Sequence, residues 1–170
     1  MLKSLADFTC TPDDDVQGFL REGAVKFQKD RITSVYLYFD EEKLRAGNPI
    51  VEGYFSLAHK SMSIANCDKK MRRFLNGTPK YDTMPFVLIC QIGKRIEENY
   101  RSELNIQTIL NDIFNVVGEA SNRIFVNNII VECKDIDKIK NLYLNSGFIE
   151  LIETQHDELH TLYMKFNNQK

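Results

Sequence analysis

The sequence has 170 residues, a length that fits one domain with a single hydrophobic core. Hydrophobic residues make up 43% of it and charged residues 27%, a composition that excludes extended disorder. Because 22 Lys and Arg stand against 24 Asp and Glu, the net charge is −2, and nucleic acid or an anionic membrane could bind only through a local patch.

The sequence lacks the motifs of several further classes of protein. The eight glycines are isolated, so neither the Gly-x-Gly-x-x-Gly dinucleotide loop nor the Walker P-loop can form. No stretch approaches the roughly 18 apolar residues of a membrane helix, and we expect a chain that is neither secreted nor membrane-spanning. The cysteines form no Cys-x-x-Cys pair, which favours a reduced, cytoplasmic protein. They are Cys10, Cys67, Cys90 and Cys133.

The first half of the chain is expected to form one helix, two strands and an insertion. Apolar residues at helical spacing, behind three acidic residues, predict an amphipathic helix over 13–29. Runs of β-branched and aromatic residues predict antiparallel strands at 33–39 and 50–59, joined by turn-forming residues. The polar, basic segment at about 60–84 is expected to be an insertion on one face of the domain, with a short helix around 69–75.

The middle of the chain is expected to form a strand-helix-strand unit. The near-continuous apolar run at 85–93 indicates a central strand that is covered on both faces. Apolar residues repeat at intervals of three and four over 104–117, and Gly118 stands where such a helix would end. A second apolar strand at 124–133 follows, so we expect a right-handed crossover between two parallel strands.

The C-terminal part is expected to add a helix and a hairpin. Asp135 can cap a helix over 136–146, and Gly147 stands at its C-terminal end. Strands at 148–153 and 160–166 read as a closing antiparallel pair. The whole chain, 1–170, is interpreted as one α/β (α+β) domain with a mixed sheet of about six to seven strands.

This order of elements, together with the segment NLYLNSGF at 141–148, resembles the Gcn5-related N-acetyltransferase (GNAT) family. In that family an apolar residue and a tyrosine near the C-terminus are followed, four residues after the tyrosine, by Gly-Phe. The matching residues here are Leu142, Tyr143, Gly147 and Phe148.

The resemblance implies an acetyl-CoA-dependent N-acetyltransferase. It would move an acetyl group to a primary amine of a small molecule, a protein or an aminoacyl-tRNA, by direct transfer in a ternary complex. Acetyl-CoA would be a cosubstrate and no metal would be needed. The resemblance makes Tyr143 the acid that protonates the departing sulfur, and it implies cofactor binding by Cys90, Gln91, Ile92, Gly93, Arg101, Ser102, Glu103 and Leu104.

The loop that binds the pyrophosphate in that family differs here. Two small residues of the family pattern are replaced by Leu104 and Ile106, which we expect to narrow the approach of the phosphates to backbone N–H groups. A second hypothesis therefore remains: a non-catalytic binding or interaction module with a GNAT fold and a degenerate CoA loop.

The general base is left open among several carboxylates. Glu132 is our first candidate, and Glu52 and Asp135 also stand near strand ends. The competing roles are solvation and helix capping, the latter in particular for Asp135. His156 and His160 stand four residues apart, but in a hairpin turn that spacing does not indicate a metal site.

One local basic cluster stands in the expected insertion. It consists of Lys69, Lys70, Arg72 and Arg73, extended by Lys60 and Lys80. Such a cluster is most often a solvated surface, and the alternative is a polyanion site that would hold tRNA through its phosphates. The sheet edges could face water or a second copy of the chain, so a homodimer also remains open.

Overall fold

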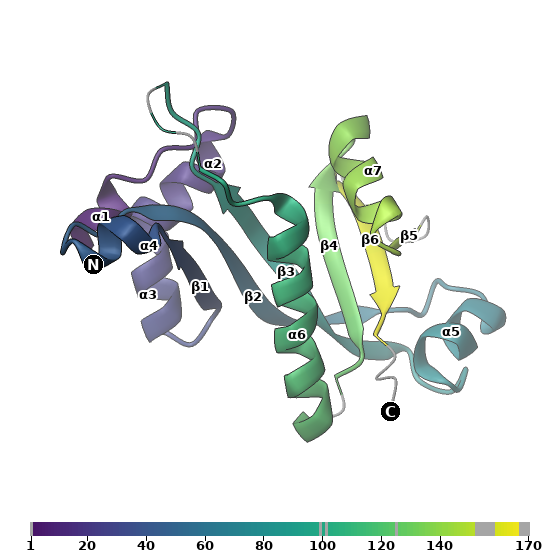
Figure 1. Ribbon diagram of the computed structural model, residues 1–170. Helices are drawn as coiled ribbons and strands as arrows, with labels where there is room; N and C mark the ends of the chain where they lie inside the picture. The colour runs from purple at the N-terminus through teal and green to yellow at the C-terminus, as the bar shows by residue number, and fades with distance from the viewer. Residues whose placement is uncertain (1, 99, 101, 125, 152–158, 167–170) are drawn as a thin grey trace. The chain divides into compact units, whose positions relative to one another are not determined.

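The computed structural model describes the chain except for residues 1, 99, 101, 125, 152–158 and 167–170. It divides into two compact units, one of Met1–Ala58 with Cys90–Ile113 and the other of His59–Ile89 with Phe114–Lys170. Six strands are hydrogen-bonded in the order β1-β2-β3-β4-β6-β5, as the expected mixed sheet requires (Figure 1). None of the helices in the described part is long and apolar enough to cross a membrane.

The first unit begins with helices. Helix α1 (Leu2–Ala6) was not expected from the sequence. The helix predicted over 13–29 is confirmed as α2 (Asp14–Gly18), a π-helical turn η1 (Phe19–Gly23) and α3 (Ala24–Lys29). Asp13 is its N-cap, because the Asp13 carboxylate accepts backbone N–H groups of the first turn.

Strands β1 (Ser34–Phe39) and β2 (Val51–Ser63) are antiparallel, as predicted. Between them the turn-forming residues fold into a short helix, α4 (Glu41–Arg45), which the sequence did not predict. The helices and these strands enclose the core of the first unit, whose buried side chains are Leu5, Phe8, Cys10, Leu20, Ala24, Val51 and Tyr54.

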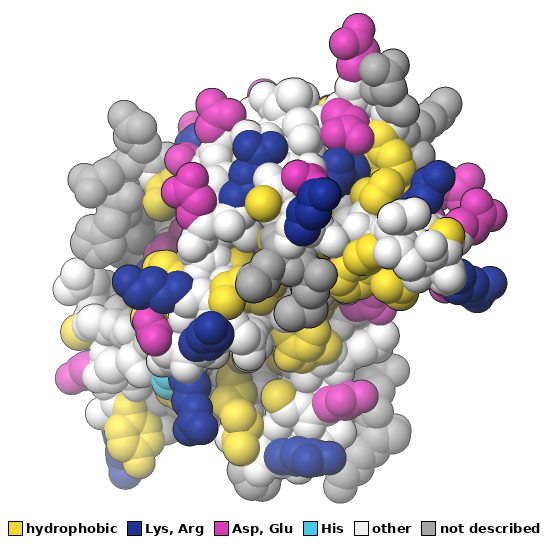
Figure 2. Space-filling model, turned by 90° about the vertical axis from the view of Figure 1, so that its left-hand side faces the viewer, with side chains coloured by type: hydrophobic (Ala, Val, Ile, Leu, Met, Phe, Trp, Pro, Cys, Tyr) yellow, Lys and Arg dark blue, Asp and Glu magenta, His cyan; other side chains and the backbone are white. Residues whose placement is uncertain are grey.

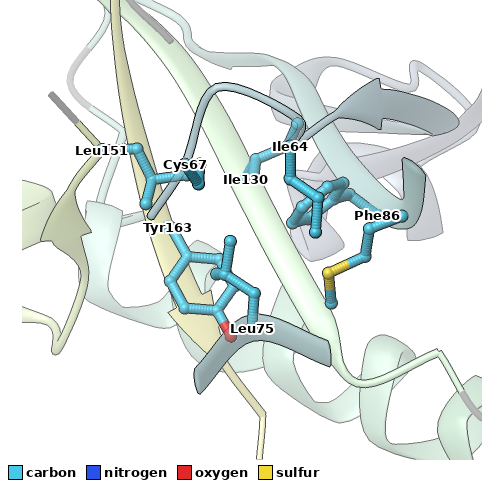
Figure 3. Close-up of a cluster of buried hydrophobic side chains, with 8 residues drawn as sticks. Ile64, Cys67, Leu75, Phe86, Ile130, Leu151 and Tyr163 are labelled. Carbon is cyan, nitrogen blue, oxygen red and sulfur yellow. The ribbon is translucent and has the colours of Figure 1, made fainter. Parts of the chain in front are cut away.

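The second unit has its own core. Helix α5 (Lys69–Asn76) lies where a short helix was expected, and Gly77 ends it with a φ of 73°. Strand β3 (Thr83–Lys94) begins in this unit. The segment between β2 and β3 contributes buried side chains to the core, which consists of Ile64, Cys67, Leu75, Met84, Phe86, Ile130, Leu151 and Tyr163 (Figure 3).

Helix α6 (Ile106–Ile124) and strand β4 (Asn128–Lys134) complete the strand-helix-strand unit. The expected end of the helix at Gly118 is wrong. A glycine inside a helix costs only about 1 kcal/mol, and the additional turn buries Ser121. The parallel pairing of β3 with β4 is confirmed, with Leu88 opposite Ile130.

Helix α7 (Asp137–Asn145) follows β4, and its N-cap is Ile136, so the expected capping role of Asp135 is wrong. The Asp135 carboxylate binds the side chain of Lys140 instead. Gly147 follows the helix with a φ of 96°, as its expected position requires. Strands β5 (Ile149–Glu150) and β6 (Leu159–Lys165) are antiparallel, and the segment that joins them lies outside the described residues.

Candidate active site

The end of β3 packs tightly on β2 within the first unit. Gly93 is buried, and a Cβ atom there would overlap the Tyr54 ring and lie 2.7 Å from Val16 Cγ1. The Tyr54 hydroxyl donates to the Val16 carbonyl at 2.7 Å and lies 2.9 Å from the Gln91 side-chain amide. The Gln91 side chain is therefore held by Tyr54, and the segment Cys90–Gly93 is fixed by contacts that only glycine permits at its end.

Arg95 anchors the loop that follows β3. Its side chain is buried and donates to the carbonyls of Val51 at 2.8 Å and Asp7 at 2.9 Å. A third nitrogen lies 3.0 Å from the Glu97 carboxylate. Arg95 could not be predicted from the sequence, because its partners include backbone groups far away in the chain and leave no local motif.

Leu104, one of the two bulky residues of the expected pyrophosphate loop, lies over Gly53 of β2. A Cβ atom at Gly53 would overlap the Leu104 side chain and would lie 2.8 Å from the Gly93 carbonyl oxygen. Gly53 therefore provides the space that Leu104 occupies. The Leu104 backbone N–H is also used, because it donates to the buried Ser102 hydroxyl at 3.1 Å.

The N-terminus of α6 presents further backbone N–H groups. Asn105 acts as the N-cap, since its Oδ1 accepts the N–H of Thr108 at 2.8 Å. Within the described residues the N–H groups of Ile106 and Gln107 have no partner. A helix of 19 residues has a positive dipole end at these groups, and this is an arrangement that favours an anion. Arg101 lies outside the described residues.

An acidic cavity of about 490 Å³ lies in the same unit. The Tyr100 hydroxyl is placed between Asp40 at 3.1 Å and Glu52 at 2.9 Å. Burial and these two carboxylates raise the pKa of Tyr100. The cavity is lined by Phe39, Asp40, Glu41, Glu42, Glu52, Tyr100 and Glu103. Of these, the sequence analysis had named only Glu52 as a candidate base and Glu103 as a cofactor contact.

Tyr143 lies in the second unit, on the buried face of α7. Its ring packs edge-on against Phe148, with 5.4 Å between the ring centroids. Burial, with a smaller contribution from the Cys133 thiolate, raises the pKa of Tyr143, so the phenol stays protonated at neutral pH. Among the described residues no hydrogen-bond partner of its hydroxyl is found.

Glu132 lies on β4 of the second unit and is paired with a cation. Its carboxylate is 2.6 Å from the Lys60 Nζ, and both side chains are partly exposed. The ion pair is the structural role that competes with its role as a general base. The charge of Lys60, which was expected to extend the basic cluster, is therefore offset by Glu132.

Among the clustered cations, Arg72 also has a partner, since its guanidinium lies 2.7 Å from Asp82 and its side chain is largely covered. Lys69, Lys70 and Arg73 are exposed on α5. On the face shown in Figure 2, basic and acidic side chains are interspersed. The α5 cations are thus a local feature, as the net charge requires.

Asp135, the third candidate base, belongs to a network with Lys140, Glu150 and His160. Its carboxylate lies 3.2 Å from Lys140, and the hydrogen bond from Lys140 is the main cause that lowers the pKa of Asp135. A carboxylate held in this way is a weak base. His156 lies outside the described residues.

The comparisons with known proteins bear on the fold. No protein-family model matches the sequence, and a search of curated proteins finds no match. AtaT, solved in complex with acetyl-methionyl-tRNAfMet, matches with a TM-score of 0.74 and 20% identity over 95% of this chain and 86% of AtaT. The chain has the GNAT fold.

Two further solved structures agree with this assignment. A Tyr-to-Phe mutant of KacT matches with a TM-score of 0.73 and 18% identity, over 95% of this chain and 86% of KacT. A structure described as a bacterial toxin matches with a TM-score of 0.76 and 15% identity, over 95% of this chain and 83% of the toxin. The GNAT fold expected from the order of elements is therefore confirmed.

The packing of Leu104 on Gly53 can be tested by overfilling it. We expect Gly53→Ala to lower the free energy of unfolding by about 1–3 kcal/mol, because the added methyl group overlaps Leu104 and crowds the Gly93 carbonyl. The double variant Gly53→Ala with Leu104→Ala should regain part of the loss. Urea denaturation measures both.

Gly18→Ala is the matched control, since a Cβ atom there meets nothing within 4 Å and the position is helical. It should leave the denaturation midpoint unchanged or raise it. An equal midpoint in Gly53→Ala and the parent protein would show that Gly53 is not needed to seat Leu104.

Proposed function

We propose that the protein is an acetyl-CoA-dependent N-acetyltransferase that transfers an acetyl group directly to a primary amine. The observation that carries this proposal is the GNAT fold, matched over 95% of the chain to AtaT. AtaT has also been solved bound with acetyl-CoA, once as the AtaTR complex and once as a Tyr-to-Phe mutant with the C-terminus of AtaR. We place the activity in the cytoplasm, in keeping with described cysteines that form no disulfide with one another.

The residues of the first unit fit a CoA ligand. The backbone of Cys90–Gly93 would pair with pantetheine and supply the oxyanion N–H. The N–H groups of Ile106 and Gln107 would receive the pyrophosphate at the N-terminus of α6. Leu104 does not prevent this fit, because its side chain packs on Gly53. We retain Arg101, Ser102 and Glu103 as further contacts, with Ser102 acting through the loop backbone.

Acetyl-CoA supplies the acetyl thioester, and the protein has to manage two protons. The attacking amine must lose a proton, for which Glu132 remains our candidate base, acting directly or through water. As the new C–N bond forms and the C–S bond breaks, the Tyr143 hydroxyl donates its proton to the sulfur. The Tyr143 phenol is protonated at neutral pH, as a proton donor must be, and the burial that raises its pKa makes it a weaker acid before the substrates bind.

We propose an aminoacyl-tRNA as the acceptor. AtaT was solved with an acetylated methionyl-tRNA. In this chain Lys69, Lys70 and Arg73 are exposed on α5, and the ring of Phe74 beside them is 48% exposed. Lys and Arg neutralise phosphates without reading bases, and an exposed ring offers a stacking surface to an unpaired base.

The phosphate contacts at α6 can be tested with a proline. Ile106→Pro removes one of the two free N–H groups, while the first position of a helix tolerates proline. We expect CoA affinity to fall about 10- to 100-fold, the scale of a lost hydrogen bond to a charged group, with little change in stability. Titration calorimetry with CoA measures the affinity.

Ile106→Ala, which keeps the N–H group, is the control and should bind CoA like the parent protein. Equal affinity in the proline variant would place the pyrophosphate elsewhere. No binding of CoA by the parent protein at millimolar concentration would favour the non-catalytic interaction module.

The role of Tyr143 is tested by removing its hydroxyl group. We expect Tyr143→Phe to lower kcat about 10²-fold or more, the scale of a lost positioned acid, without changing KM for acetyl-CoA. Release of free CoA thiol, followed with aminoacyl-tRNA or a panel of amines, gives both constants. Tyr163→Phe is the control, because Tyr163 is equally buried in the same unit and its hydroxyl binds Asn128. Equal kcat in the parent and Tyr143→Phe would mean that another group protonates the sulfur.

The RNA surface is tested by charge reversal. We expect the triple variant Lys69→Glu, Lys70→Glu, Arg73→Glu to lose retention of tRNA, and the slope of log affinity against log salt to flatten by roughly 0.7–0.9 for each lost phosphate contact. Reversal of Lys26 and Lys29, exposed on α3, is the control and should leave retention unchanged. If the triple variant still retained tRNA, the cations of α5 would be a solvated surface and not an RNA-binding site.

A further inference from the structure

We propose that Lys140 and His160 are positioning residues for Tyr143. They would act through a closed ring of four titratable side chains, Asp135, Lys140, Glu150 and His160, which we call the α7 charge network. The inference rests on the proposed role of Tyr143 as the acid, and it deepens that proposal by naming what holds the acid in place.

In the α7 charge network, each basic side chain bridges both carboxylates. Lys140 Nζ lies 3.2 Å from Asp135 and 3.5 Å from Glu150. His160 Nδ1 lies 2.7 Å from Glu150, and its Nε2 lies 3.4 Å from Asp135. The ring is therefore closed, and none of its four members depends on a single contact.

The basic members of the network are largely covered, whereas the Asp135 side chain is 60% exposed. The side chain of Lys140 is 18% exposed and that of His160 is 19% exposed. Charge pairs that are partly withdrawn from water interact more strongly than fully exposed ones, and an organised network is worth more than isolated pairs. Both ring nitrogens of His160 face carboxylate oxygens, and both can donate only when the imidazole is protonated. The ring then balances two positive and two negative charges.

The four members of the network come from every segment around α7. Asp135 precedes the helix, Lys140 lies within it, Glu150 is on β5 after it and His160 is on β6. A helix of nine residues is marginal by itself, and this one has no side-chain hydrogen bond at its N-cap. The network therefore links the middle of α7, through Lys140, to the segment before the helix and to β5, and His160 connects both carboxylates to β6.

Members of the α7 charge network also lie close, in the sequence or in the strand pairing, to Tyr143 and its neighbours. Lys140 is three residues before Tyr143, a spacing that puts the two side chains on neighbouring positions of the helix. Cys133, whose thiolate contributes to the raised pKa of Tyr143, stands directly opposite His160 in the β4–β6 pairing. Phe148, which packs on the Tyr143 ring, is two residues before Glu150. The network and the Tyr143 side chain therefore depend on the same three segments, which are α7, the end of β4 and the chain that leads into β5.

A loosened α7 would misplace the hydroxyl of Tyr143 without touching the residues assigned to CoA. Displacement of a catalytic group by about 1 Å can cost up to about 10²-fold in rate. We therefore expect Lys140→Met, which keeps the length of the side chain and removes its charge, to lower kcat about tenfold and to leave KM for acetyl-CoA unchanged. Lys140→Arg should restore the rate, because it restores the charge.

A double-variant cycle separates positioning from general damage. In a Tyr143→Phe background Lys140→Met should have no further effect on kcat, because no hydroxyl remains to be positioned. The same fold loss in both backgrounds would overturn the inference. Equal kcat in Tyr143→Phe and the parent would instead overturn the acid assignment, and the inference with it.

A measurement that needs no acetyl transfer completes the test. Amide hydrogen exchange in the α7 peptide should be at least about tenfold faster in Lys140→Met and in His160→Gln than in the parent protein. Lys138→Met is the matched control, since Lys138 is exposed on the same helix and should leave exchange unchanged. Unchanged exchange in the Lys140 and His160 variants would show that the network does not hold α7, whatever the activity of the protein.

Discussion

The close approach of β2 and β3 at two glycines is the constraint on which the candidate cofactor loop depends. Gly53 leaves room for the Leu104 side chain and for the Gly93 carbonyl, and Gly93 leaves room for Tyr54. Side chains larger than hydrogen at either position would separate the strands. The loop after β3 is thereby seated on β2, and Arg95 fixes its start through the carbonyls of distant segments.

The packing of Leu104 on Gly53 explains how a GNAT fold can have a bulky residue in this loop, where the GNAT family pattern has a small one. The family pattern uses small residues so that the backbone can approach phosphates. In this chain Leu104 is placed on β2, and its N–H is donated to Ser102. Among the described residues, the backbone N–H groups of Ile106 and Gln107 remain without a partner, so the proposed phosphate contacts belong to the first turn of α6.

In the second unit, the main feature of the candidate site is the uncharged phenol of Tyr143 on the short helix α7. Burial keeps Tyr143 protonated, and Phe148 fixes the face of its ring. Charged side chains of this unit are paired with one another, as in the ion pair of Glu132 with Lys60. If Glu132 is the general base, its carboxylate would therefore exchange its contact with Lys60 for a contact with the attacking amine during the reaction.

The sequence by itself determined the order of the longer helices and strands, though not α1 and α4, because periodicity and capping are local properties. The helix begun by Asp13, the parallel pairing of β3 with β4 and the glycine after α7 were all predicted. Only the tertiary structure decided where α6 ends, what Asp135 binds and where Leu104 packs. These outcomes depend on partners far along the chain, such as His160 for Asp135 and Gly53 for Leu104. Spacing within a segment carries no information about such partners, since they meet only when the sheet forms.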